Sequence, residues 1–238
     1  TNTKEEIAKL ILALEDQLDA LLTSEILVRT EKEHSTHADS RTYFVQIFQS
    51  FYHECREITA EILKLDPLYA PIAIKYYAQI TDKIVISAME SVTQFIHPLA
   101  NPTNSEKVCV LAVGGYGRKE MAPFSDIDLL FITPYKQTAW GESVIETILY
   151  ILWDLKMKIG YAVRTIDDCI RLSKQDITIR TTLLEHRYLV GELYLQKSLE
   201  NRLWEEIFSK TGPEFIEAKL EERAGRHLRQ GGVRYMLE

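Results

Sequence analysis

Two aspartates separated by one residue, Asp126 and Asp128, are the side chains in this sequence best suited to chemistry. Successive side chains on a β-strand point to opposite faces, so the two carboxylates are expected to share one face. Carboxylates this close repel each other unless a cation or a hydrogen-bond donor lies between them. Hard oxygen ligands of this kind suit Mg²⁺, which binds one or two carboxylates together with substrate phosphates. The pair therefore predicts a metal site that acts on a phosphorylated substrate.

Two adjacent glycines, Gly114 and Gly115, precede the aspartates, with ten residues between Gly115 and Asp126. Glycine has no Cβ atom, so the backbone can turn sharply there and approach a phosphate closely. Backbone N–H groups at the start of a following helix would face an anion. Apolar runs at 108–113 and 129–132 flank the unit. We expect a strand, a glycine turn, a short helix and a second strand, built to hold a nucleoside triphosphate and its metal.

The elements around this unit are mostly helical. Apolar residues recur at three- and four-residue spacings, which is typical of amphipathic helices. Helices are predicted at about 4–26, 40–65, 70–95, 141–158, from 167 or 168, 176–188, 192–209 and 213–230, with a short strand at 161–165. Gly160 is expected to end the helix before that strand. Because strands are predicted only between about 107 and 165, the fold class is predicted as α+β, a small mixed sheet flanked by helices.

Composition narrows the class of protein. The 238 residues carry a net charge of −7, which argues against a protein whose main task is gripping a nucleic-acid backbone. No apolar run approaches the roughly 18 residues of a membrane span. The cysteines Cys55, Cys109 and Cys169 show no ligand spacing, so reduced, buried thiols in a cytoplasmic protein are expected. We expect neither a nucleic acid nor a membrane as partner.

The glycine–aspartate pattern resembles a known signature. A hydrophobic residue, two glycines, about ten residues and Asp-x-Asp between apolar residues is similar to the signature of the nucleotidyltransferase fold shared with polymerase beta. The match goes further and resembles the N-terminal catalytic domain of the PII uridylyltransferase/uridylyl-removing enzymes over about residues 107–238. The matching residues are Gly114 to Arg118, Glu120, Pro123, Ser125 to Leu130, Leu152 to Leu155, Gly160, Val163 to Thr165, Asp176, Leu183 to Glu185, Arg187, Arg226, His227, Tyr235, Leu237 and Glu238.

The resemblance implies a function. Members of this family transfer UMP from UTP to a tyrosine of the nitrogen-regulatory PII protein, using Mg²⁺ or Mn²⁺, and pyrophosphate is released. The family also carries an HD-type phosphohydrolase domain and two ACT domains that this sequence lacks, so UMP removal and glutamine sensing are expected to be absent. Three parts are expected: a helical N-terminal region at 1–104, a polymerase-beta-like catalytic domain at 105–190, and at 191–238 the start of a helical substrate-side domain in a truncated chain.

Site roles follow from this interpretation. Asp126 and Asp128 are the expected catalytic residues and metal ligands. The nucleotide-binding candidates are Gly114, Gly115, Arg118, Ser125 and Arg164. Glycine amides would cradle phosphates, and guanidinium groups match phosphate oxygens in a two-pronged geometry. Ser125 would donate to a phosphate or orient Asp126. Each side chain also has a structural alternative: a surface charge for Arg118, an ion pair with a helix acid for Arg164, and a local backbone bond for Ser125.

The sequence departs from the pattern of the family at two points. Lys119 stands where the family often has glycine, and we expect the turn to tolerate it. Many nucleotidyltransferases use a third carboxylate from a later strand, but that strand carries Arg164 here, and Asp167, Asp168 or Glu120 would have to supply the group. The sequence does not reveal the base preference. A nucleotidyltransferase that moves another nucleotide, such as AMP from ATP, onto a protein or small molecule therefore remains an alternative, and so does an inactive regulatory or binding fragment of this fold.

Overall fold

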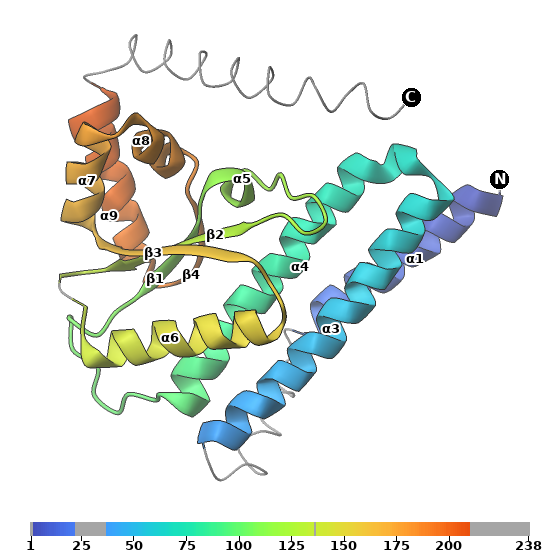
Figure 1. The fold of residues 1–238 in the computed structure, drawn as a ribbon, viewed down its shortest axis with the longest axis horizontal. Coiled ribbons are helices and arrows are strands. Elements are labelled where there is room, and N and C mark those ends of the chain that lie inside the picture. Colours follow the sequence, from blue (N-terminus) through green and yellow to red (C-terminus); the bar gives the residue numbers. More distant parts are fainter. Residues whose placement is uncertain (1, 22–36, 136, 210–238) are drawn as a thin grey trace.

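A four-stranded mixed β-sheet lies at the centre of the molecule, with helices on both faces (Figure 1). The computed structural model describes residues 2–21, 37–135 and 137–209. The strands are β1 (Cys109–Ala112), β2 (Ile127–Thr133), β3 (Ile159–Thr165) and β4 (Arg187–Gly191), in the order β3-β2-β1-β4 across the sheet. β1 pairs antiparallel with β2 and β4, whereas β2 and β3 are parallel. The predicted α+β class with a small mixed sheet is confirmed.

Long helices form the N-terminal part, as the apolar periodicity predicted. They are α1 (Asn2–Ala20), α3 (His37–Leu65) and α4 (Ala70–Ser91), with the short turns η1 (Pro67–Tyr69) and η2 (Val92–Ile96) at the two ends of α4. Asp66 ends α3 because the residue before a proline is pushed out of the helical region, and its backbone is extended. The Asp66 side chain then accepts a hydrogen bond from the Leu68 N–H, which starts the next turn.

The remaining helices cover both faces of the sheet (Figure 1). They are α5 (Gly114–Gly117), α6 (Ala139–Asp154), α7 (Ile166–Gln175), α8 (Ile177–Leu184), α9 (Leu193–Leu203) and the π-helical turn η3 (Trp204–Phe208). α6 provides the crossover that the parallel strands β2 and β3 require. The Thr138 side chain begins α6 by accepting a hydrogen bond from the Gly141 N–H.

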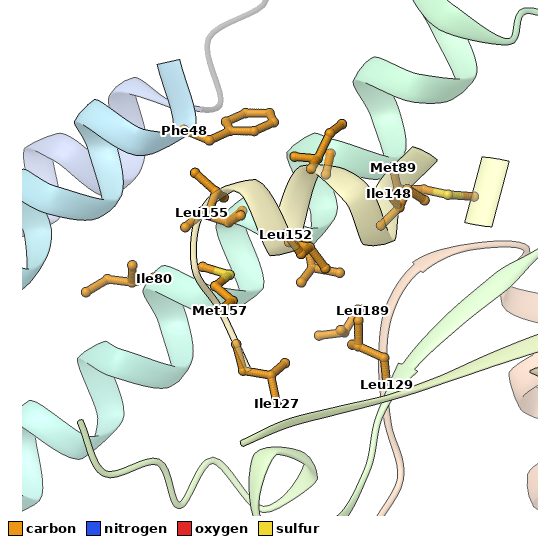
Figure 2. Packing of buried hydrophobic residues seen from close by; sticks show 14 of the residues in the cluster. Phe48, Ile80, Met89, Ile127, Leu129, Ile148, Leu152, Leu155, Met157 and Leu189 are labelled. Carbon is orange, nitrogen blue, oxygen red and sulfur yellow. The ribbon is translucent and has the colours of Figure 1, made fainter. Parts of the chain in front are cut away.

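Strand β2 sends alternate side chains into two separate hydrophobic clusters, one on each face of the sheet. Ile127, Leu129 and Phe131 join the larger cluster, which α3, α4 and α6 complete (Figure 2). Leu130 and Ile132 join the smaller cluster with residues of α7, α8 and α9. The two-residue period of a strand therefore places Asp128 on the α7–α9 face, opposite Ile127 and Leu129, as the sequence predicted.

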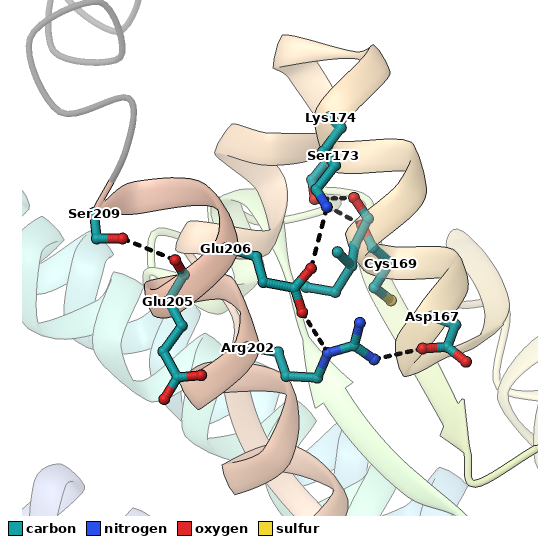
Figure 3. A network of polar contacts seen from close by, with 9 residues as sticks. Asp167, Cys169, Ser173, Lys174, Arg202, Glu205, Glu206 and Ser209 are labelled. Carbon is teal, nitrogen blue, oxygen red and sulfur yellow. Dashed lines mark hydrogen bonds and ion pairs between the residues drawn. The ribbon is translucent and has the colours of Figure 1, made fainter.

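Exposed ion pairs link α7, α9 and η3 on the face of the sheet that carries the smaller hydrophobic cluster (Figure 3). The Arg202 guanidinium of α9 contacts the Asp167 carboxylate of α7, and its Nε lies 2.8 Å from Glu206 Oε1. The Lys174 ammonium of α7 lies 3.1 Å from Glu206 Oε2. Side chains this exposed gain little from ion pairing, so burial in the smaller hydrophobic cluster holds α7 against α9.

Several of the predicted element boundaries are wrong. The helix predicted at about 4–26 ends at Ala20. The helix predicted at 176–188 ends at Leu184, and residues 187–191 form strand β4, which the sequence analysis missed. A five-residue segment carries too little periodicity to identify it, and pairing with β1 decides its conformation. The helix predicted at 141–158 ends at Asp154, so Gly160 lies inside β3 and does not end a helix. The strand predicted at 161–165 accordingly begins two residues earlier.

Other sequence predictions stand as follows. The three cysteines are buried, as predicted, and burial raises the pKa of the Cys55, Cys109 and Cys169 thiols to about 12. Across the described residues, none of the helices has the length and apolarity that crossing a bilayer requires. The helix predicted at 213–230 and the matching residues from Arg226 onward lie outside the described residues. The three-part division at 104 and 190 stays a prediction, although one hydrophobic cluster contains residues from both sides of position 104.

Candidate active site

The Asp128 carboxylate occupies a space that two glycines leave empty. Asp128 lies in β2 directly opposite Gly160 of β3. A Cβ atom added at Gly160 would lie 2.5 Å from Asp128 Oδ1, and one added at Gly114 would lie 3.2 Å from Asp128 Oδ2. Gly114 also has a φ angle of +60°, a conformation that favours glycine. Both glycines are therefore needed for this position of the carboxylate.

The surroundings of the Asp128 carboxylate change its pKa. Burial, and secondly the nearby Asp126 carboxylate, raise the pKa of Asp128 above the usual range of an aspartate. Asp126 itself is exposed and immediately precedes β2. Both effects disfavour the ionised form of Asp128, and a bound cation would relieve both. The described residues contain no group of three or more side chains suited to hold a metal. A two-carboxylate donor set of this kind fits Mg²⁺, which takes its other ligands from phosphates and water.

A cavity of about 290 Å³ opens beside Asp128. Three predicted site residues line it together: Gly114, Asp128 and Arg164. The other lining residues are Val113, Leu129, Leu130, Gly160, Tyr161, Ala162, Thr182 and Leu183. Arg164 forms no ion pair with a carboxylate among the described residues, so the predicted structural alternative for this side chain finds no partner there. One carboxylate and one guanidinium thus share a cavity with a glycine turn.

The other nucleotide-binding candidates lie outside the lining of this cavity. Arg118 Nε lies 2.7 Å from Glu120 Oε2, and Arg118 Nη1 lies 2.6 Å from Glu185 Oε2. Arg118 is thus engaged in ion pairs beside the glycine turn. Gly115 is half-buried in α5. Ser125 lines a different cavity, and its backbone N–H donates to the Ala122 carbonyl, 3.1 Å away.

An ion pair that the sequence analysis missed anchors the glycine turn to the N-terminal helices. Both terminal nitrogens of Arg187, at the start of β4, donate to the Asp82 carboxylate of α4, at 2.8 and 3.0 Å. The same guanidinium donates to the carbonyl oxygens of Tyr116 and Gly117 in α5. Arg187 therefore joins α4, β4 and the turn that contains Gly114. Its partners Asp82, Tyr116 and Gly117 lie 70 to 105 residues away in sequence, so no local pattern could have identified these contacts.

Comparison with known proteins gives the family. No protein-family model matches the chain. The chain is 55% identical over 179 residues to the bifunctional uridylyltransferase/uridylyl-removing enzyme of Cereibacter sphaeroides. These aligned residues cover 75% of the chain and 19% of the relative. Enzymes of the same name from Ruegeria pomeroyi and Rhodopseudomonas palustris are 52% and 40% identical, over 87% and 95% of the chain and 23% and 24% of the relatives. The chain is homologous to part of these enzymes.

The resemblance predicted from the sequence is therefore confirmed, and the chain spans about a fifth to a quarter of the length of these uridylyltransferase/uridylyl-removing relatives. Tyr116, Gly160 and Arg187 are among the residues on which the resemblance was recognised. The geometry gives each of them a physical role, since Gly160 makes room for Asp128 and Arg187 binds the Tyr116 carbonyl. A glycine inside a strand can mark a close approach of another group, but this signal applies to Gly160 only once the strand is known to begin at Ile159.

The three candidates for a third carboxylate have other partners. Asp168 forms a capping box with Thr165 at the start of α7, and hydrogen bonds from Arg171 and Thr165 lower the pKa of its carboxyl. Asp167 contacts Arg202, and Glu120 contacts Arg118. None of the three lines the cavity beside Asp128, whose described lining contains no other acid. The third carboxylate of this site stays unassigned.

Proposed function

We propose that this chain is a cytoplasmic nucleotidyltransferase module that moves UMP from UTP to a tyrosine of the nitrogen-regulatory PII protein, releasing pyrophosphate, with Mg²⁺ or Mn²⁺ as cofactor. One observation carries this function. The Asp128 carboxylate lies between Gly114 and Gly160 on the wall of a cavity that also contains Arg164. This arrangement occurs in a chain 40–55% identical to proteins whose name includes uridylyltransferase.

The proposed reaction transfers UMP from UTP to the oxygen of the acceptor tyrosine. The tyrosine oxygen forms a bond to the α-phosphorus of UTP, the bond from that phosphorus to the bridging oxygen breaks, and the phenolic proton passes to solvent. Asp126 and Asp128 would hold the metal ion, which when bound supplies positive charge to the phosphates. Arg164 would donate two hydrogen bonds to phosphate oxygens, and its fixed fork would orient them. Gly114 and Gly115 allow the backbone N–H groups of the turn to approach the phosphates without interference from a Cβ atom.

Asp128→Asn tests the proposed function most directly. The amide keeps the size of the side chain but removes the negative charge, so the fold should persist while metal-dependent transfer of UMP to PII falls by at least about a hundredfold. Asp19→Asn is the matched control, because it makes the same change at an exposed position of α1. Transfer is measured with labelled UTP, and folding by thermal unfolding. Full activity of Asp128→Asn would refute the metal-binding role.

Nucleotide choice requires a second experiment. UTP, ATP, CTP and GTP, each with Mg²⁺, are compared for the increase in unfolding temperature that they cause, because a ligand stabilises the state that binds it. The proposal predicts the largest increase for UTP. A larger increase for ATP would favour transfer of AMP instead. If calorimetry detects no binding of UTP at millimolar concentration with Mg²⁺, the chain is a regulatory or binding fragment of this fold.

A further inference from the structure

A second cavity lies beside the loop that carries Asp126, and its wall is basic and aromatic. The cavity measures about 60 Å³. Its lining includes Arg56, Phe124, Ser125, Ile127, Lys156 and Lys158. No carboxylate belongs to this lining. The name basic surface is used below for four of its lining residues, Arg56, Phe124, Lys156 and Lys158.

Backbone strain is concentrated at the basic surface. Only three non-glycine residues of the described chain have positive φ angles, and two of them, Phe124 at +66° and Lys156 at +61°, line this one cavity. Such conformations cost free energy for residues with a Cβ atom and persist where the surroundings hold them. The Arg56 guanidinium provides that hold, since it lies 4.2 Å from the centre of the Phe124 ring. Phe124 nevertheless stays 73% exposed, so a large aromatic side chain is presented to solvent beside Asp126.

The charge of the basic surface is not neutralised within the described residues. Arg56, Lys156 and Lys158 form no ion pair there. This positive region belongs to a chain with a net charge of −7, so it cannot be explained by general basicity. A local cluster of cations on an acidic protein attracts an anionic partner and repels a basic one.

The basic surface and the cavity beside Asp128 lie on opposite faces of the sheet. Ile127 lines the small cavity, whereas the next residue, Asp128, lines the 290 Å³ cavity on the opposite face of the sheet. Phosphates held by Asp128 and Arg164 therefore lie across the end of β2 from Lys156 and Lys158. Ser125 and Ile127, the two neighbours of Asp126 in the chain, both line the small cavity, so the basic surface lies beside Asp126.

We propose that the basic surface docks an acidic segment of the acceptor protein and thereby brings the acceptor hydroxyl to the end of β2. This inference rests on the proposed function and adds to it the side from which the acceptor approaches. Lys156 and Lys158 supply the charge, and the exposed Phe124 ring supplies apolar contact. Association that depends on such charges is weakened by salt.

The test uses the double variant Lys156→Glu/Lys158→Glu and its neutral counterpart Lys156→Gln/Lys158→Gln in the full chain, with PII as acceptor and labelled UTP. The KM for PII should rise about tenfold in the charge-reversed variant and less in the neutral one, and the rise should shrink in high salt. The KM for UTP and the unfolding temperature should stay unchanged. Lys197→Glu, at an exposed position of α9 on the opposite face, reverses one charge away from the surface and controls for a non-specific effect of charge reversal.

Each other outcome has a defined meaning. An unchanged KM for PII in active variants would overturn the docking proposal and leave the proposed function intact. A rise in the KM for UTP alone would also overturn it, because the anion bound at this surface would then be the nucleotide. Absence of UMP transfer by the wild-type chain would overturn the proposed function itself, and the docking proposal with it.

Discussion

Gly160→Ala should disable the site without unfolding the protein. The added Cβ would lie 2.5 Å from Asp128 Oδ1, whereas an ordinary contact begins at about 3.4 Å. The carboxylate must therefore move by about 0.9 Å or rotate away from its place between the two glycines. A displacement of about 1 Å at a catalytic group costs about a hundredfold in rate. We expect kcat for UMP transfer to fall by about that factor.

Stability should respond differently from activity. Alanine is more favourable than glycine inside a strand by roughly 0.5–1 kcal/mol, which offsets part of the strain from moving the carboxylate. The unfolding temperature should thus stay within roughly 3 °C of the wild type. Gly141→Ala is the matched control, because it adds the same methyl group in α6, outside the cavity lining. Gly160→Ala with kcat within twofold of the wild type would refute the idea that the missing Cβ positions Asp128.

Three further predictions concern charged groups of the site. Arg187→Ala leaves the Asp82 carboxylate without this guanidinium, and the two side chains are only 21% and 16% exposed in the native pair. Chemical denaturation should therefore show a loss of roughly 3 kcal/mol. Arg202→Ala breaks two more exposed ion pairs, with Asp167 and Glu206, and should cost less than about 1 kcal/mol for each pair. Arg164→Ala should raise the KM for UTP by about tenfold or more, because a charge-assisted hydrogen bond contributes roughly 1.5–3 kcal/mol; an unchanged KM in steady-state kinetics would remove Arg164 from the site. The pKa of Asp128 is raised in the folded state, so the stability that its protonated form contributes is lost as pH rises through that pKa. Asp128→Asn, which stays uncharged, should therefore unfold at a higher temperature than the metal-free wild type at pH 7. Mg²⁺ with UTP should narrow or reverse this difference in unfolding temperature.

The local part of the site could be predicted from sequence because its chemistry is local. Asp126, Asp128 and the two glycines lie within fifteen residues, and the period of a strand is enough to place Asp128 opposite the core residues Ile127 and Leu129. The strand itself is identified by its apolar run. These inferences need no knowledge of which segments pair, and the structure agrees with the strand and with the face on which Asp128 lies.

The rest of the site depends on pairings between distant segments. Gly160 acquires its role only when β3 pairs in parallel with β2 and brings it opposite Asp128. Arg187 acquires its role only when β4 pairs with β1 and brings the guanidinium to Asp82. A glycine after an amphipathic helix is a common helix end, so the local signal at Gly160 favoured the wrong interpretation. The wrong interpretation of Gly160 and the failure to predict β4 have the same cause, because the register between strands is set by tertiary packing.

The N-terminal helices contact both the glycine turn and the loop that precedes Asp128. α4 contacts the turn through Asp82 and Arg187, and α3 contacts the loop through Arg56 and Phe124. Both helices also contribute to the hydrophobic cluster that packs beneath β2, so their positions are fixed by burial. A displacement of α3 or α4 would therefore be transmitted to the two segments that carry the glycines and carboxylates. The helical region thus serves as the rigid support that the proposed metal and phosphate site would require.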